Sequence, residues 1–246
     1  MNNFANFDRS QIFPSIKLKF PNASFCFFHG SMLTRTENQL SDVDVIVVTS
    51  DTCQPFREEF IVEKRVYDAF IFDAESLNGA MHGLHRNCSG ALAYGVANGV
   101  VLPQANAVST KLANLAKRLC ARPMVASQSL LTLRRHSLTK VMDDLPYAKS
   151  PSERTLLAID AAKNIVEVRL LADGKGMNSA KYSARLFFAR WPEQFAQIEL
   201  ALQNAFAGEP EVLIALCNQA LLQIGGPLRG TLRMDLPNSL RLSLPP

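Results

Sequence analysis

The chain has 246 residues, 48% of them hydrophobic, which is enough for one large domain or two modest ones with a packed core. Its formal net charge of +4 and isoelectric point near 8.9 suit an anionic ligand, but Lys and Arg are scattered without clustered aromatics, which disfavours a nucleic-acid-binding surface. No apolar stretch approaches the ~20 residues of a membrane span, and the N-terminus has no basic signal region.

The cysteines indicate a reducing compartment. They are odd in number and none has the C-x-x-C spacing, so free thiols in the cytosol are expected for Cys26, Cys53, Cys88, Cys120 and Cys217. His82 and His85 share one helix face, but a surface or capping role explains that spacing better than a metal site. We therefore expect a soluble, cytoplasmic protein.

The first chemically informative segment is the apolar run 25–29, a strand candidate, followed by Gly30 and Ser31. Glycine lets the backbone approach a ligand closely, and the N–H groups at a helix start attract phosphate. The pair therefore predicts a phosphate-binding turn that leaves the strand and opens a helix. Arg35 and Ser41, which flank the same turn, are expected to add contacts.

Asp42 and Asp44 follow, in a β-branched run that continues to residue 48. Side chains at i and i+2 of a strand share a face, so the two carboxylates point the same way while Val43 and Val45 face the core. Two carboxylates about 7 Å apart repel each other unless a cation lies between them. Mg²⁺ prefers such hard oxygen ligands, completed by substrate phosphates and water.

A third acid, Asp68, lies within the otherwise apolar and aromatic run 65–72. An isolated buried carboxylate is costly without a partner. A strand next to Asp42 and Asp44 would supply one, with Asp68 as the third ligand of the same metal site.

The rest of the N-terminal half is expected to complete a mixed sheet with helices on one side. Asp73 can cap a helix that carries Leu77 and Met81, and residues 100–103 resemble a short final strand. Between these elements the glycines at 90, 95 and 99 are expected to break the helical pattern.

From about residue 107 the pattern is helical only. Helices are expected from Ser109, over 124–142, 151–171 and 178–190, and over 192–222 with a break near Gly208, before an extended tail. The predicted fold class is α+β, with an N-terminal mixed-sheet domain over 1–106 and an all-α helical bundle over 107–246.

The 151–171 helix is apolar except for one narrow stripe, formed by Asp160, Lys163, Asn164 and Glu167. A solvated face explains the stripe. The alternative is that it lines a cleft between the domains, in which case Asp160 or Glu167 could act as a general base.

Together, Gly-Ser, ten intervening residues, Asp-x-Asp and a later acid on a strand resemble the signature of the nucleotidyltransferase superfamily related to polymerase beta. The resemblance covers roughly residues 23–72. In length and in its helical second half the chain is similar to the aminoglycoside and lincosamide nucleotidyltransferases.

The resemblance implies an enzyme that transfers a nucleoside monophosphate, AMP from ATP being expected, to a hydroxyl of a small molecule and releases pyrophosphate. Two Mg²⁺ ions would be held by Asp42, Asp44 and Asp68, with Gly30, Ser31, Ser41 and Lys181 binding the triphosphate. Asp68, Asp160 and Glu167 stay open as the general base.

Two alternatives remain beside this reading. A protein side chain could be the acceptor (AMPylation), or the chain could be a non-catalytic, antitoxin-like nucleotide-binding module. The absence of a helix-hairpin-helix or basic channel disfavours templated polymerisation. The nucleotide base, the acceptor and the oligomeric state stay open.

Overall fold

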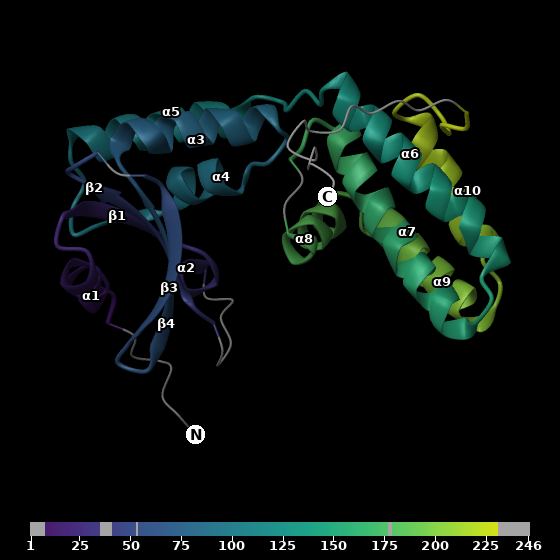
Figure 1. Cartoon of the computed structure of the whole chain (residues 1–246), viewed down its shortest axis with the longest axis horizontal. Coiled ribbons are helices and arrows are strands. Elements are labelled where there is room, and N and C mark those ends of the chain that lie inside the picture. The colour runs from purple at the N-terminus through teal and green to yellow at the C-terminus, as the bar shows by residue number, and fades with distance from the viewer. Residues whose placement is uncertain (1–7, 35–40, 53, 177–178, 231–246) are drawn as a thin grey trace, which may run out of the picture. The chain divides into compact units, whose positions relative to one another are not determined.

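The computed structural model describes residues 8–34, 41–52, 54–176 and 179–230. The chain divides into two compact units, one formed by Met1–Ser127 with Arg169–Pro192, the other by Gln128–Val168 with Glu193–Pro246. The first contains the sheet and helices α1, α3, α4 and α5 (Figure 1). Its elements are η2 Arg9–Gln11, α1 Ile12–Lys19, β1 Ala23–His29, α2 Ser31–Thr34, β2 Val43–Thr49, β3 Phe56–Val62, β4 Arg65–Phe72, α3 Ala74–Arg86, α4 Ala91–Asn98, β5 Val100–Leu102, α5 Ala107–Ala121 and α8 Ala180–Arg190.

Within the described part of the chain, five strands lie in the order β3-β4-β2-β1-β5. The β2–β4 pair is parallel and the other pairs are antiparallel, so the sheet is mixed and the predicted α+β class is confirmed. As expected, β4 lies next to β2, and the register places Asp44 opposite Asp68. On the other side of β2, His29 is the partner of Asp44.

Strand β3 was not expected from the sequence. It is an edge strand with three consecutive charged residues, Arg57, Glu58 and Glu59, so it lacks the apolar alternation of a half-buried strand. The turn that joins it to β4 is built on Glu63 and Lys64, both with positive φ, where hairpins usually carry Asn or Gly. Neither local signal therefore marks the hairpin.

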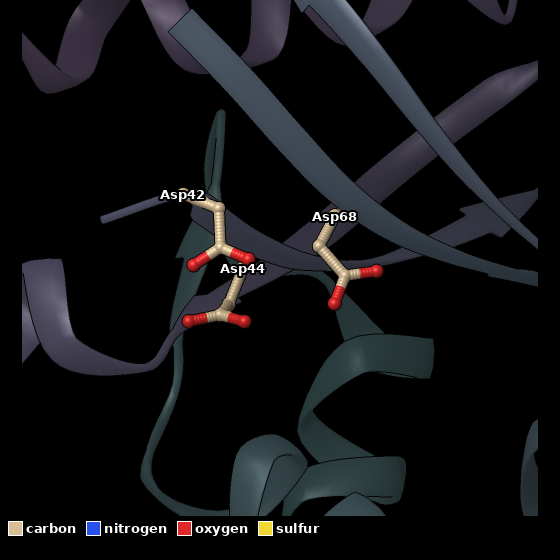
Figure 2. Close-up of side chains that lie close together, drawn as sticks. All are labelled: Asp42, Asp44 and Asp68. Carbon is tan, nitrogen blue, oxygen red and sulfur yellow. The ribbon is translucent and has the colours of Figure 1, made fainter. Parts of the chain in front are cut away.

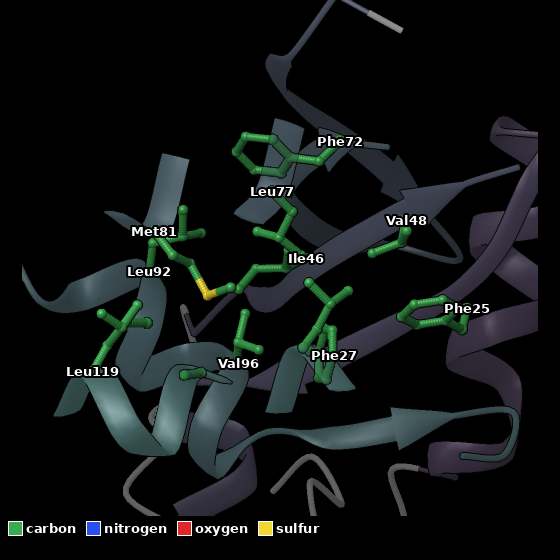
Figure 3. Close-up of a cluster of buried hydrophobic side chains, with 13 residues drawn as sticks. Phe25, Phe27, Ile46, Val48, Phe72, Leu77, Met81, Leu92, Val96 and Leu119 are labelled. Carbon is green, nitrogen blue, oxygen red and sulfur yellow. The ribbon is translucent and has the colours of Figure 1, made fainter. Parts of the chain in front are cut away.

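Both faces of the sheet are covered by helices, which corrects the expectation of helices on one side only. One face packs against α3, α4 and α5, through the cluster in Figure 3: Phe25, Phe27, Ile46, Val48, Phe72, Leu77, Met81, Leu92, Ala93, Val96, Leu112, Ala116 and Leu119. The opposite face packs against α1, whose Ile12 and Ile16 are fully buried against Val43, Val45 and Val47.

Two expectations about helix limits are also corrected. Helix α5 is capped by Asn106, whose side chain accepts from the amide of Ser109, so Ser109 is the third residue of the helix, within a capping box, and not the cap. Gly95 does not break the pattern but lies inside α4. It packs closely on the sheet: a Cβ there would lie 3.1 Å from Cδ1 of Ile46, so a larger residue would require a neighbour to shift.

The second unit is entirely helical within the described residues. It contains α6 Gln128–Asp144, η3 Leu145–Tyr147, most of α7 Pro151–Ala172, α9 Pro192–Ala207 and α10 Glu211–Leu222. The boundary expected at 106/107 would separate α5 from the sheet, whereas Leu112, Ala116 and Leu119 of α5 complete the core of the first unit. Among the described residues no helix is both long and apolar enough to cross a bilayer.

A candidate metal site at the start of strands β2 and β4

Three carboxylates converge at one edge of the sheet. Asp42 directly precedes β2, Asp44 is its second residue, and Asp68 lies in β4 (Figure 2). One oxygen from each carboxylate lies within 4.8 Å of the others. Asp68 is buried at 8% exposure, and the other two are partly buried.

Parallel pairing explains this convergence. Because β2 and β4 run in the same direction, their starts meet at one edge, and partners in register point to the same side of the sheet. Val43 and Val45 alternate with the acids and are fully buried on the opposite face. The hydrophobic alternation of β2 therefore holds the carboxylates in place.

Gly30 makes room for this arrangement. Its φ is +82°, and a Cβ at this position would lie 1.8 Å from Oδ2 of Asp44. The next residue, Ser31, donates its backbone N–H to the Asp44 carboxylate. In this structure the Ser31 amide therefore helps to position Asp44.

The pKa of Asp44 is raised to about 6, chiefly by burial and then by the charges of Asp42 and Asp68. The positive charge of Lys181 on α8 and the Ser31 amide oppose the rise. Lys181 thus lies within electrostatic range of the acids, although α8 is more than a hundred residues further along the chain.

The donor set suits a divalent cation. It consists of hard carboxylate oxygens from three side chains, close enough to bind one ion or to share two. Burial, followed by the charges of Asp42 and Asp68, raises the pKa of Asp44, and a cation between the oxygens would relieve the repulsion among the three carboxylates. We conclude that the residues fit Mg²⁺ or a similar ion.

Arg57 on β3 contacts the site and was not found from the sequence. Its Nε donates to Oδ1 of Asp68 at 2.7 Å, and its Nη2 donates to Oδ2 at 2.9 Å. Nη2 also donates to Glu59 at 3.2 Å. The only signal would have been the pairing of β3 with β4, which the sequence did not reveal.

His29, the last residue of β1, is the second residue that was missed. Its Nε2 is buried and has no hydrogen-bond partner among the described residues. Burial lowers its pKa, opposed by the negative charges of Asp68 and Asp42. The ring lies beneath Gly95 of α4, whose Cβ would be 3.3 Å away. The His29 side chain thus lies next to the acidic cluster, on the strand position paired with Asp44.

The other predicted residues are distributed as follows. Ser41 is partly buried directly before Asp42, and Arg35 lies outside the described residues. Asp160 and Glu167 belong to the helical unit. Asp160 is exposed, whereas Glu167 is buried and its Oε2 lies 2.8 Å from Nη1 of Arg134, so the stripe is not a uniformly solvated face.

No family model matches the chain, and no curated protein matches it in sequence. Among solved structures it is similar to a nucleotidyltransferase-like protein from Exiguobacterium sibiricum 255-15. The two share 14% identity at a TM-score of 0.49, over 89% of this chain and 77% of the other. A likeness at this level bears on neither the activity of this chain nor the roles of its residues.

Proposed function

We propose that the chain is a metal-dependent nucleotidyltransferase that moves a nucleoside monophosphate, AMP from ATP in the first instance, to a hydroxyl of a small molecule. The observation that carries this proposal is the convergence of Asp42, Asp44 and Asp68 beside the Gly30 turn. In such a transfer a hydroxyl attacks the α-phosphorus and pyrophosphate leaves. We further propose that the acceptor is a small molecule similar to an aminoglycoside or a lincosamide.

In the proposed roles, Asp42 and Asp44 would hold the cation that binds the triphosphate, and Asp68 would complete the ligand set of a second ion. Two divalent ions would supply charge neutralisation for the attacking and leaving oxygens. Asp68, the most buried of the three, is proposed to orient the acceptor hydroxyl and to help remove its proton.

The remaining contacts are assigned to phosphate. Lys181 supports this role because its charge already acts on Asp44. Gly30 and Ser31 are proposed to bind phosphate through their backbone N–H groups and the Ser31 hydroxyl, and Gly30 lets the turn lie directly on the Asp44 carboxylate. Ser41 is proposed as a further hydroxyl donor at the start of β2.

The test is Mg²⁺-dependent release of pyrophosphate from each of the four nucleoside triphosphates, labelled at the α-phosphate. Each is offered with a panel of aminoglycosides and lincosamides, and the label is then followed into the acceptor. Asp44→Asn and Asp68→Asn should abolish release. Asp51→Asn, an exposed acid outside the cluster, serves as the matched control.

Each outcome has a defined meaning. Release that persists in both cluster variants, or no metal-dependent release with any triphosphate, would contradict the proposal. Label recovered on protein instead of the small molecules would keep the chemistry and replace the acceptor by a protein side chain.

A further inference from the structure

Arg57 reaches the acidic cluster from the neighbouring edge strand. Asp68 pairs in register with Glu59, and Phe70 pairs with Arg57, so all four side chains share one face of the β3–β4 pair. The guanidinium lies 5.3 Å from the centre of the Phe70 ring and donates to both oxygens of Asp68. The geometry is the two-pronged arrangement that arginine makes with carboxylates.

This contact contributes little to stability. The Arg57 side chain is 53% exposed, and ion pairs with an exposed partner typically contribute only about 0–1 kcal/mol. Asp68, in contrast, has a side chain that is only 10% exposed. The main physical effect of the pair is therefore on Asp68, whose carboxylate it orients and whose negative charge it offsets.

The pair also competes with a cation. Both oxygens of Asp68 already accept a charge-assisted hydrogen bond from Arg57, so a metal that binds Asp68 shares each oxygen with the guanidinium. The positive charge of Arg57, which is hydrogen-bonded to Asp68, also weakens the attraction of the three acids for a divalent ion. Both effects act in the same direction.

We infer that Arg57 is a positioning residue that shares Asp68 with the metal and limits how tightly the acidic cluster binds it. The inference rests on the proposed function, since it takes the three acids as cation ligands. Arg57 would then regulate the metal site without itself binding metal or substrate.

Glu59 provides the alternative partner that such sharing requires. It lies two residues along the same strand, and its Oε1 already accepts from Nη2 of Arg57 at 3.2 Å. Arg57 can therefore give up one bond to Asp68 and keep its pairing with Glu59. Weak intrinsic cation binding would make the site depend on the phosphates that arrive with the nucleotide.

The experiment measures Mn²⁺ binding without nucleotide, by the electron paramagnetic resonance signal of free Mn²⁺. Arg57→Gln removes the charge and should tighten binding about tenfold, the effect of one unit charge a few ångström away. Arg57→Lys keeps the charge and should stay within about threefold of the wild type. Glu59→Gln removes a negative charge beside the cluster. This variant should bind Mn²⁺ as tightly as the wild type or more weakly.

The rise in melting temperature with added Mn²⁺ is the second readout and should follow the same order. Binding by Arg57→Gln that equals or falls below the wild type would overturn the inference. So would an Arg57→Gln variant that fails to fold in the presence of EDTA, because the pair would then be structural.

The proposed function fails separately. If the wild type and Asp44→Asn bind Mn²⁺ identically, the acids are not the metal site at all. Wild-type binding that Asp44→Asn abolishes, combined with an unchanged Arg57→Gln, would contradict only the role of Arg57.

Discussion

At the scale of single residues, the site brings together groups that would not stay together without cause. Asp42, Asp44 and Asp68 repel one another, and the raised pKa of Asp44 records that repulsion together with the cost of burial. The folded scaffold supplies the energy that keeps them close. Substitutions in such a site can therefore raise stability while they remove activity.

Asp44→Asn should be more stable than the wild type at neutral pH. Above pH 6 the Asp44 carboxylate is charged in both states, and only the folded state has its pKa raised, from 3.8 to about 6. As pH falls from 6 to 4, the folded wild type binds this proton first and gains stability. The advantage of the variant should shrink over that range and vanish near pH 4, as measured by chemical denaturation.

Asp8→Asn is the control of opposite sign, because the Ser10 side chain and amide lower the pKa of Asp8. Removing that carboxylate should cost stability at neutral pH and nothing at low pH. If the stability advantage of Asp44→Asn does not change with pH, the raised pKa of Asp44 is contradicted.

Gly30→Ala should lower both stability and metal binding. The new Cβ would lie 1.8 Å from Oδ2 of Asp44, so the carboxylate or the turn must move, and the positive φ adds about 1–2 kcal/mol of strain. Gly226→Ala is matched for backbone: its φ is +79°, with no atom within 4 Å of the added methyl. We expect Gly30→Ala to lose more stability in urea than the control, and to lose Mn²⁺-dependent stabilisation as well. Equal losses would show that only φ matters.

At the scale of elements, glycine in a helix can be an entropic cost or a packing requirement. Gly79 lies on an exposed face of α3, whereas Gly95 of α4 lies directly on Ile46 and His29. Both positions have helical backbone, so local conformation does not distinguish them. Their surroundings do.

Gly79→Ala should therefore raise the free energy of unfolding by about 0.5–1 kcal/mol through helix propensity alone. Gly95→Ala gains the same propensity, but its methyl would lie 3.1 Å from Cδ1 of Ile46 and 3.3 Å from the His29 ring. We expect the gain to be lost or reversed in urea denaturation. A Gly95→Ala variant as stable as Gly79→Ala would show that α4 can shift away from the sheet.

The α6–α7 pair carries an ion pair that the helical pattern could not reveal. The Arg134 side chain is 25% exposed and that of Glu167 is 10% exposed. Glu167→Gln should lower the free energy of unfolding by about 1–3 kcal/mol, less than for a fully buried pair, because Arg134 loses its partner. Asp160→Asn, at an exposed position of the same stripe, should stay within about 0.5 kcal/mol.

Kinetics of the same two variants test the general base. If Asp160 or Glu167 is the general base, the turnover of the corresponding variant should fall ~10²–10⁴-fold, with little change in triphosphate affinity. Unchanged turnover in both would leave the role to Asp68.

At the scale of the whole molecule, the first compact unit is not a continuous stretch of chain. It takes α5, and then α8 with its flanking residues, from beyond the boundary that composition suggested at residue 106. Helix α5 supplies side chains to the main core, and α8 supplies the Lys181 charge that acts on Asp44. The chain must therefore return to the sheet unit to complete it.

A fragment of residues 1–106 should not unfold cooperatively. It lacks Leu112, Ala116 and Leu119, and their loss uncovers the core beside Leu77 and Met81. A fragment of residues 1–127 keeps α5 and should show a sigmoidal thermal transition by circular dichroism. The same sharp transition in both fragments would contradict the role of α5 in this core.

Short-range patterns in the sequence were sufficient for the carboxylate strands and for several helices. The alternation around Asp42 and Asp44, the lone acid in run 65–72 and the cap at Asp73 each depend on residues a few positions apart, and the structure has these elements. The adjacency of β2 and β4 was also predicted, because Asp68 required a partner.

The tertiary structure alone decided what contacts those residues. Arg57 reaches Asp68 from an edge strand without an apolar pattern, His29 lies under a glycine that reads as a helix breaker, and α1 covers the second face. Each contact depends on strand order or on the packing of distant segments. Hydrophobic periodicity states which side of an element is buried but not which partner buries it, and for this chain that partner determines the surroundings of the acidic site.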